Sequence, residues 1–540
     1  MNEKFSTLAQ IIFLTLAVAG WQIFLRLPEE SDTYFVMNLG RYILEHGFPH
    51  VDPFTIHENL KLVPQQWLSG IFFLEVFKNF GFDGLRFADF ILGAATVLIY
   101  WRLCLYVSGR RKTLSFVLSL AVGIFVAPSI VPRPQIISTL LFLIEVFFLE
   151  KFTRSGDAKF LIALPLVSIA LINFHAAMWL MSLVICLPFL FVKNFRHAKF
   201  LLAAMAGIFL CGFINPYGAE AMTYVFRSYG VELISENIPE MRTPTAHDWR
   251  GKIFYFSEAL LIISLAKFKI PLRYIFLSGG ITLMAIMHAR SLMLFYFVAT
   301  IPLAYVWKDL TPPKIFAGRG LLTILFFLLV AANTLIITQI FKGGLEKISL
   351  PLEIFFFIAA AVVVYNLLVL KFERRLLHPA ILPQKNLSLF ITALIVSGIF
   401  VTTLHEDKKE SAETFSDAIK FLLRSERPEN ISLYVNQGIG GLAGMFGVKY
   451  YIDSRSEVFI DANNGQKNIL AEYIDLTNGR IYYRDFFSRY KFTHIILTSE
   501  DKFLYEALRR DKNFRVIYES ERVEGYKVIR CKVFVPREEV

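Results

Sequence analysis

A cluster of carboxylates follows the first apolar stretch of the chain. Glu29, Glu30 and Asp32 occupy three of four consecutive positions, and Asp52 lies further along the same hydrophilic segment. Carboxylates placed beside a reacting group accept or deliver protons, so this cluster is a candidate for general acid–base chemistry. The oxygen of Ser31 or Asp32 can also accept the free N–H groups at the start of a following helix. Capping and catalysis are compatible roles for the same residues.

Two arginines are candidates for binding an anion. Arg133 lies between Pro132 and Pro134, and Arg290 follows an apolar stretch that ends near His288. Both are expected at the outer ends of membrane-spanning helices, where an unpaired charge is costly and usually has a function. The planar guanidinium group matches the geometry of a phosphate. The alternative is that both side chains simply extend to the membrane interface.

Metal-binding patterns are absent from the sequence. The four cysteines, Cys104, Cys186, Cys211 and Cys531, show neither a CxxC pair nor the spacing of a zinc site. Histidine and cysteine do not cluster anywhere at ligand spacing. A bound ion, if the protein uses one, is therefore expected to be a divalent cation held by oxygen ligands.

The composition indicates that membrane-spanning helices position these residues. Of the 540 residues, 55% are hydrophobic and 19% are charged, and the mean hydropathy is +0.51. Soluble proteins carry about 25% charged residues. We expect an all-α polytopic membrane domain over residues 1–404, starting with an uncleaved anchor. Its approximately 13 spans are predicted at 8–25, 85–107, 113–131, 134–150, 158–174, 176–192, 199–215, 253–267, 271–287, 291–307, 319–340, 351–370 and 387–404.

The charges of the loops predict the orientation of these spans. Lysine and arginine are concentrated in alternate connections, such as 110–112, 193–199 and 371–385. The positive-inside rule then places the N-terminus in the cytoplasm. Two long loops, 26–84 and 216–252, and the C-terminal domain are predicted on the extracytoplasmic side. The net charge of +11 is spread over helix ends, which argues against nucleic-acid binding.

Residues 405–540 are predicted to form a small soluble α/β domain. Five candidate strands, at 431–435, 449–452, 493–498, 514–519 and 526–534, alternate with short helical stretches. The segment from Gly438 to Ala443 matches G-x-G-x-x-A. We interpret it as a glycine-lined turn, because the domain is expected to face away from cytoplasmic nucleotides. Asp453 and Arg455 are expected either to pair with each other or to contact an acceptor glycan.

The acidic first loop, with two interfacial helices predicted around 34–46 and 67–80, resembles that of the GT-C glycosyltransferases. Relatives in that superfamily are protein O-mannosyltransferases, the aminoarabinose transferase of lipid A and oligosaccharyltransferase. The chain is more closely similar to an uncharacterised bacterial membrane family with the patterns D-x-D-T-x-x-H-x-x-x-G-R-x-I, P-H-x-D-P-F-[ST] and H-E-W-L. The matching segments here are Glu30–Thr33 with Gly40–Ile43, and Pro49–Thr55. Val36 replaces the usual histidine, and Gln65-Gln66 replace His-Glu.

The resemblance implies a function at the outer face of a bacterial inner membrane. A sugar would pass with inversion from a polyprenyl-phosphate donor to an extracytoplasmic glycan, lipid or protein acceptor. Asp32 would accept the acceptor's proton, with Glu30 or Asp52 as the second acid or as a metal ligand. Arg133 and Arg290 would bind the phosphate of the lipid donor.

Two other functions compete with glycosyl transfer. A non-catalytic scaffold for envelope assembly is favoured by the replacements at Val36 and at Gln65-Gln66. A lipid or polysaccharide transporter would usually show internal repeats and paired charges within its spans. The sequence shows no clear repeat. The first loop discriminates between these functions, since only an enzyme needs Asp32 for turnover.

Overall fold

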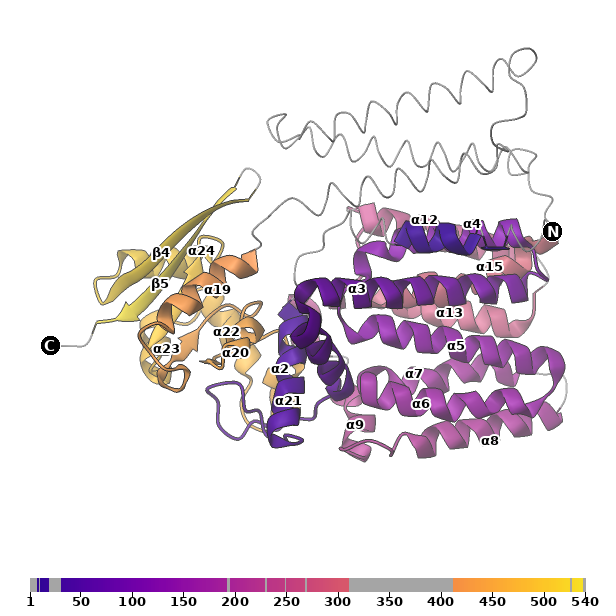
Figure 1. Cartoon of the computed structure of the whole chain (residues 1–540), viewed down its shortest axis with the longest axis horizontal. Helices are drawn as coiled ribbons and strands as arrows, with labels where there is room; N and C mark the ends of the chain where they lie inside the picture. The colour runs from indigo at the N-terminus through magenta and orange to yellow at the C-terminus, as the bar shows by residue number, and fades with distance from the viewer. Residues whose placement is uncertain are drawn as a thin grey trace, which may run out of the picture.

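The computed structural model describes residues 7–8, 10–18, 31–191, 195–228, 231–247, 249–267, 270–309, 411–524 and 527–537. A helical bundle contains the described residues up to 309, and a domain built on a β-sheet contains those from 411 onward (Figure 1). Glu29 and Glu30 lie outside the described residues. So do the predicted spans 319–340, 351–370 and 387–404 and the predicted domain boundary near residue 404.

The bundle consists of helices that run side by side (Figure 1). Its longer helices are α3 (Trp67–Val107), α4 (Lys112–Val126), α5 (Pro134–Ser155), α6 (Ala163–Phe174), α7 (Ala176–Cys186), α8 (Phe195–Cys211), α12 (Trp249–Lys267) and α13 (Leu272–Met287). The chain from residue 289 to 309 continues through η5 (Ala289–Ser291), α14 (Leu292–Leu294), the π-helical η6 (Phe295–Ala299), α15 (Ile301–Val306) and η7 (Trp307–Asp309). Every predicted span between 85 and 307 coincides with one of these helical stretches.

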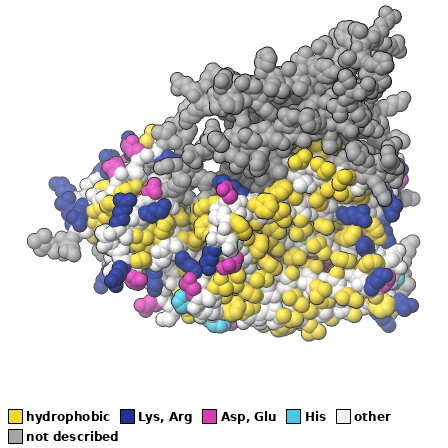
Figure 2. Space-filling model, viewed as in Figure 1, with side chains coloured by type: hydrophobic (Ala, Val, Ile, Leu, Met, Phe, Trp, Pro, Cys, Tyr) yellow, Lys and Arg dark blue, Asp and Glu magenta, His cyan; other side chains and the backbone are white. Residues whose placement is uncertain are grey.

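Length and composition suit only some of these helices for crossing a membrane alone. Within the described residues, Trp67–Val107, Lys112–Ser129 and Ala289–Asp309 meet both criteria, and Ala158–Phe174, Ala176–Leu190 and Leu272–Met287 are apolar but shorter. The predicted number of 13 spans therefore stays a prediction. The visible surface of the bundle is largely hydrophobic, while charged side chains gather over the sheet domain and at the bundle ends (Figure 2).

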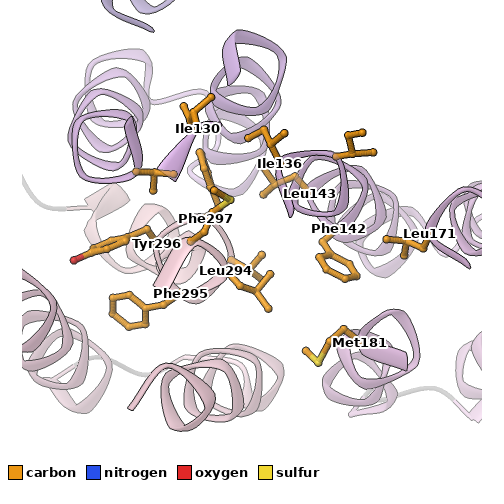
Figure 3. Close-up of a cluster of buried hydrophobic side chains, with 14 of the residues drawn as sticks. Ile130, Ile136, Phe142, Leu143, Leu171, Met181, Leu294, Phe295, Tyr296 and Phe297 are labelled. Atoms are coloured by element: carbon orange, nitrogen blue, oxygen red, sulfur yellow. The ribbon is translucent and has the colours of Figure 1, made fainter. Parts of the chain in front are cut away.

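Large side chains fill the centre of the bundle. Phe142 and Leu143 of α5 and Leu171 of α6 are completely buried, and so are Phe295 and Phe297 of η6. These side chains approach one another from several helices (Figure 3). Close packing of this kind holds membrane helices together, since lipid tails are as apolar as the side chains themselves.

Helix α2 (Ser31–His46) lies across the end of the bundle, between the bundle and the sheet domain (Figure 1). It packs on the first part of α3, which is separated from the remainder by a non-helical Gly81 (φ 62°). The two interfacial helices predicted in the first loop therefore correspond to α2 and to the part of α3 before Gly81. The backbones of α2 and α3 come closest together at Gly40 and Gly70. A Cβ added at Gly40 would lie 2.3 Å from the carbonyl oxygen of Gly70.

The C-terminal domain has one five-stranded sheet in the order β2-β1-β3-β5-β4. Strands β1 (Ser432–Tyr434), β2 (Lys449–Tyr450) and β3 (His494–Thr498) are parallel, and β4 (Phe514–Glu524) and β5 (Lys527–Pro536) add an antiparallel hairpin. All five strands lie where the sequence predicts strands. The accompanying helices are α19 (Ser411–Leu422), α20 (Gly440–Met445), α21 (Asp461–Asn464), α22 (Ile469–Thr477), α23 (Tyr483–Tyr490) and α24 (Lys502–Arg510).

The two long loops, 26–84 and 216–252, contribute side chains to the core of the sheet domain. Leu60 and Leu62 of the first loop, and Ile234 and Met241 of the second, belong to the same buried cluster as the sheet residues. Short helices α9 (Ala219–Thr223), α10 (Val225–Ser228), α11 (Glu232–Asn237) and η4 (Pro239–Met241) give the second loop its shape. The loops and the domain therefore form one packed layer over the end of the bundle.

Candidate functional site

Asp32 lies in the first turn of α2, where its carboxylate pairs with Arg133. Oδ2 of Asp32 lies 3.1 Å from Nη2 of Arg133, and their side chains are 24% and 15% exposed. The hydroxyl of Thr33 donates to the carbonyl of Pro132 at 3.2 Å. Oδ1 of Asp32 has no hydrogen-bond partner among the described residues. Arg133 therefore fixes one of the two carboxylate oxygens of Asp32.

Arg133 joins the two long loops at this point. It precedes α5 with an extended backbone (φ −126°, ψ 152°), as a residue before proline requires. Its Nη1 donates to Oε1 of Glu240 in η4 at 2.9 Å. Arg133 thus bridges two carboxylates, one from each loop. The sequence predicted a phosphate ligand here, and its alternative was a side chain merely reaching the interface. The structure shows an ion-pair bridge instead of a simple extension.

Arg290 lies on η5, directly beside the second loop. Nδ1 of His288 lies 2.8 Å from the carbonyl oxygen of Met241, and the N–H of Ala289 donates to the carbonyl of Arg242 at 2.9 Å. The Arg290 side chain is exposed and makes no hydrogen bond or ion pair with a described residue. An exposed arginine at this position is well suited to bind an anionic ligand.

Asp52 lies in a different environment from Asp32. Its Oδ1 accepts from Nη1 of Arg455 at 2.7 Å, while its Oδ2 accepts from the N–H and hydroxyl of Thr55 at 3.0 and 2.7 Å. Arg455 also pairs with Asp453 at 2.8 Å, and Tyr450 donates to Asp453 at 2.6 Å. The side chains of both aspartates are fully buried.

This buried network bears on the role expected for Asp52, which stays a prediction. A carboxylate whose two oxygens already have three protein donors cannot readily accept a substrate proton, so its environment argues against the second acid predicted from the sequence. Asp52 instead fastens the first loop to the sheet domain. Asp453 and Arg455 pair with each other, as one of the two sequence-based alternatives proposed.

Helix α2 is fastened to the same domain through α20. Arg41 donates to the carbonyls of Met445 and Gly444 at 2.9 and 2.6 Å, and Asn38 donates to the carbonyl of Gly441 at 2.7 Å. These bonds connect side chains of α2 to backbone carbonyls along α20. The glycines of the G-x-G-x-x-A segment therefore serve close packing, since a Cβ at Gly440 would lie 2.1 Å from the carbonyl oxygen of Ile452.

His57 adds a pH-sensitive contact between the first loop and the sheet domain. Nε2 of His57 lies 2.9 Å from the carbonyl oxygen of Tyr451, and the ring packs against Tyr451 and Tyr490. Burial and the charge of Lys467 lower the pKa of His57 from 6.5 to about 4, although Asp52 and Glu472 act in the opposite direction.

Lowering the pH is expected to destabilise the folded protein through His57. Between pH 6.5 and about 4 the unfolded chain binds more protons at this residue than the folded chain does. The contribution of His57 to the free energy of unfolding is complete above pH 6.5. Up to about 3 kcal/mol of it is lost as the pH falls through this window. Melting temperatures of detergent-purified wild type and His57→Gln should therefore converge on acidification. Parallel pH profiles would contradict this assignment.

Metal coordination finds little support in the described part of the chain. No group of three or more histidine, cysteine, aspartate or glutamate side chains gathers there closely enough to hold an ion. Asp32 faces a cation, Arg133, rather than a set of oxygen ligands. The divalent cation that the sequence left open therefore stays a prediction, and we derive no step through one.

An apolar cavity of about 540 Å³ opens at the same end of the bundle. Its lining comes from the start of α3, from α6 and from the residues after α8, and includes Trp67, Leu166, Asn173 and Pro216. The indole N–H of Trp67 donates to Oδ1 of Asn173 at 3.0 Å. His175 follows two residues later, and the charge of Arg290 acts on its ring. The lining of the cavity therefore extends to within two residues of His175, which lies at the turn between α6 and α7.

Solved structures with the same arrangement reveal the fold type. The structure matches the apo oligosaccharyltransferase of Archaeoglobus fulgidus over 93% of this chain and 70% of that chain, with a TM-score of 0.51 and 12% identity. It matches ArnT from Cupriavidus metallidurans, bound to undecaprenyl phosphate, over 96% and 97% of the chains, with a TM-score of 0.52 and 12% identity. The protein has a GT-C-like membrane fold.

A second structure of the archaeal GT-C enzyme, tethered with an acceptor peptide, matches over 92% of this chain and 70% of that chain, with a TM-score of 0.50 and 11% identity. No protein-family model matches the chain, and no curated protein matches it by sequence. At this level of identity the likeness defines the GT-C-like fold alone. The chemistry has to be argued from the residues of this chain.

Proposed function

We propose that this protein is a glycosyltransferase that transfers a sugar, with inversion, from a polyprenyl-phosphate donor to an acceptor on the extracytoplasmic side of a bacterial inner membrane. The observation that carries the proposal is the convergence of Asp32, Arg133 and Arg290 at one end of a GT-C-like bundle, beneath both outward loops. Two similar folds support the ligand classes, since one is bound to undecaprenyl phosphate and the other to an acceptor peptide.

The proposed reaction is a single displacement at the anomeric carbon of the sugar. An acceptor hydroxyl or amide forms the new bond to this carbon, and its proton passes to the free oxygen of Asp32. The bond between the anomeric carbon and the phosphate oxygen breaks, and its electron pair leaves with the polyprenyl phosphate. Arg290 stabilises the negative charge on the phosphate. Arg133 fixes the orientation of Asp32, and the apolar cavity beside Trp67 takes part of the lipid chain.

Neutralising Asp32 is expected to stop turnover without unfolding the protein. Loss of a general base typically lowers the rate by about 10²- to 10⁴-fold. In cells that produce Asp32→Asn at wild-type levels, lipid mass spectrometry should show a polyprenyl-phosphate sugar that accumulates. The matched control is Asp83→Asn, whose side chain is 92% exposed in the same loop. Unchanged lipids and unchanged envelope glycans in Asp32→Asn cells would instead favour the non-catalytic scaffold.

A further inference from the structure

A carboxylate of the sheet domain faces the proposed site and takes no part in the reaction described above. Glu457 lies on η11 (Ser456–Phe459) and is half-buried. Its carboxylate accepts a hydrogen bond from the backbone N–H of Glu457 itself and forms no ion pair with another described residue. Its electrostatic neighbours include Asp32 and Arg290, which belong to the proposed site, and Arg455.

The backbone that carries Glu457 is held firmly. Arg455, two residues earlier, forms the buried ion pairs with Asp52 and Asp453. Nε2 of Gln437 donates to the hydroxyl of Ser456 at 2.7 Å, and Nδ2 of Asn463 donates to the carbonyl of Glu457 at 2.8 Å. These contacts allow a single placement of the η11 backbone.

The same contacts direct η11 toward Asp32. The guanidinium group of Arg455 lies 5.9 Å from the ring centre of Phe35. Phe35 is three residues after Asp32 on α2, so the two side chains share a helix face. Glu457 is therefore brought to the Asp32 side of α2 by residues whose positions are fixed.

We propose that Glu457 is the acceptor-binding carboxylate of this site, accepting a hydrogen bond from a hydroxyl or ammonium group of the acceptor beside its attacking atom. The inference rests on the proposed transferase function. In this proposal Glu457 takes the place of Asp52 as the second carboxylate of the site, because both oxygens of Asp52 already have protein donors.

Electrostatics favours the acceptor over the donor as the partner of Glu457. The phosphate of the donor is anionic and is attracted to Arg290, whereas Glu457 repels it. Burial raises the pKa of Glu457, and the hydrogen bond from its own backbone N–H and the charge of Arg290 lower it; Asp32 raises this pKa and Arg455 lowers it, each with a smaller effect. Two neighbouring carboxylates, Asp32 and Glu457, create a negative field that attracts the hydrogen-bond donors of an acceptor.

The test compares Glu457→Gln with Asp32→Asn in cells that produce the full chain at equal levels. Glu429→Gln is the control, because Glu429 is an exposed glutamate of the same domain. We expect Glu457→Gln cells to accumulate the lipid-linked sugar at least tenfold over wild type, and Glu429→Gln cells to resemble wild type. Glu457→Asp should restore part of the turnover, since it keeps the charge.

Binding of undecaprenyl phosphate to the purified proteins separates a substrate role from a structural one. Glu457→Gln should bind this lipid at least as tightly as wild type, because a negative charge near Arg290 is removed. Arg290→Gln should bind it about tenfold or more weakly. Weakened binding in both Glu457→Gln and Glu457→Asp would show that Glu457 is structural and would overturn the inference.

The remaining outcomes distinguish this inference from the proposed function. Accumulation in Asp32→Asn cells, with a wild-type lipid profile in Glu457→Gln cells, overturns the role of Glu457 and leaves the transferase intact. An unchanged lipid profile in Asp32→Asn cells and in cells that lack the protein overturns the transferase, and the role of Glu457 with it.

Discussion

Replacing Arg455 by methionine is expected to destabilise the folded protein by about 3 to 5 kcal/mol. The substitution leaves Asp52 and Asp453 buried without their shared cation, and uncompensated buried charges are among the costliest defects in a protein. Packing against Phe54, whose ring centre lies 5.2 Å from the guanidinium carbon, is lost as well. Equilibrium unfolding in detergent, followed by tyrosine and tryptophan fluorescence, measures the loss.

Two further variants make this prediction specific. Arg530→Met removes an ion pair with Glu521 of similar length, 2.7 Å, whose side chains are 56% and 55% exposed, and should cost less than about 1 kcal/mol. Asp52→Asn leaves the Arg455–Asp453 pair in place and should fall between the two, at about 1.5 to 3 kcal/mol. Equal effects for Arg455→Met and Arg530→Met would show that burial does not govern the energetics of this network.

Replacing Gly40 by alanine is expected to cost about 3 kcal/mol or more, because the added Cβ meets the backbone of α3. Its contacts would be 2.3 Å to the carbonyl carbon and oxygen of Gly70 and 2.7 Å to the nitrogen of Ile71. Backbone atoms cannot rotate aside as a side chain can, so α2 must shift away from α3. A shift of α2 also displaces Asp32, and turnover should fall together with stability.

Gly279 provides the control for this second prediction. It lies within α13, and a Cβ added there would meet nothing within 4 Å. Alanine favours helix by about 1 kcal/mol over glycine, so Gly279→Ala should be neutral or stabilising. Thermal unfolding of both variants in the same detergent makes the comparison. A Gly40→Ala protein as stable as Gly279→Ala would exclude a tight crossing of α2 and α3.

Residues with strong local signals were predictable from the sequence. Apolar runs locate the helices between 85 and 307, and short runs of β-branched, aromatic and other apolar residues locate all five strands, since each pattern reports only on its own segment. The two interfacial helices of the first loop were likewise predictable, because Ser31 and Asp32 favour a helix start. Asp32, Arg133 and Arg290 stood out because charges at the ends of apolar helices are costly.

Pairings between distant segments were not predictable in this way. Asp32 and Asp52 both belong to the polar first loop. The carboxylate of Asp52 is nevertheless buried against Arg455, whereas that of Asp32 pairs with Arg133. Glu457 carries no signal beyond its position two residues after Arg455. Glu240 is one of several charged residues in a polar loop, and only the folded structure shows that it pairs with Arg133. Tertiary packing, rather than local propensity, decides each of these cases.

The contacts between α2, the first loop and the sheet domain also set the timing of biosynthesis. Asp52 and Arg455 are 403 residues apart, and Arg41 and Met445 are 404 apart. At a typical elongation rate of 5–20 residues per second, roughly 20 to 80 seconds separate the translation of these partners. During this interval α2 can pack on α3, but α20, which accepts its hydrogen bonds, has not yet been synthesised. In a nascent chain the contact between α2 and α3 therefore precedes the contacts with the sheet domain, and a chain that stops before residue 411 lacks the partners of Asp52 and Arg41.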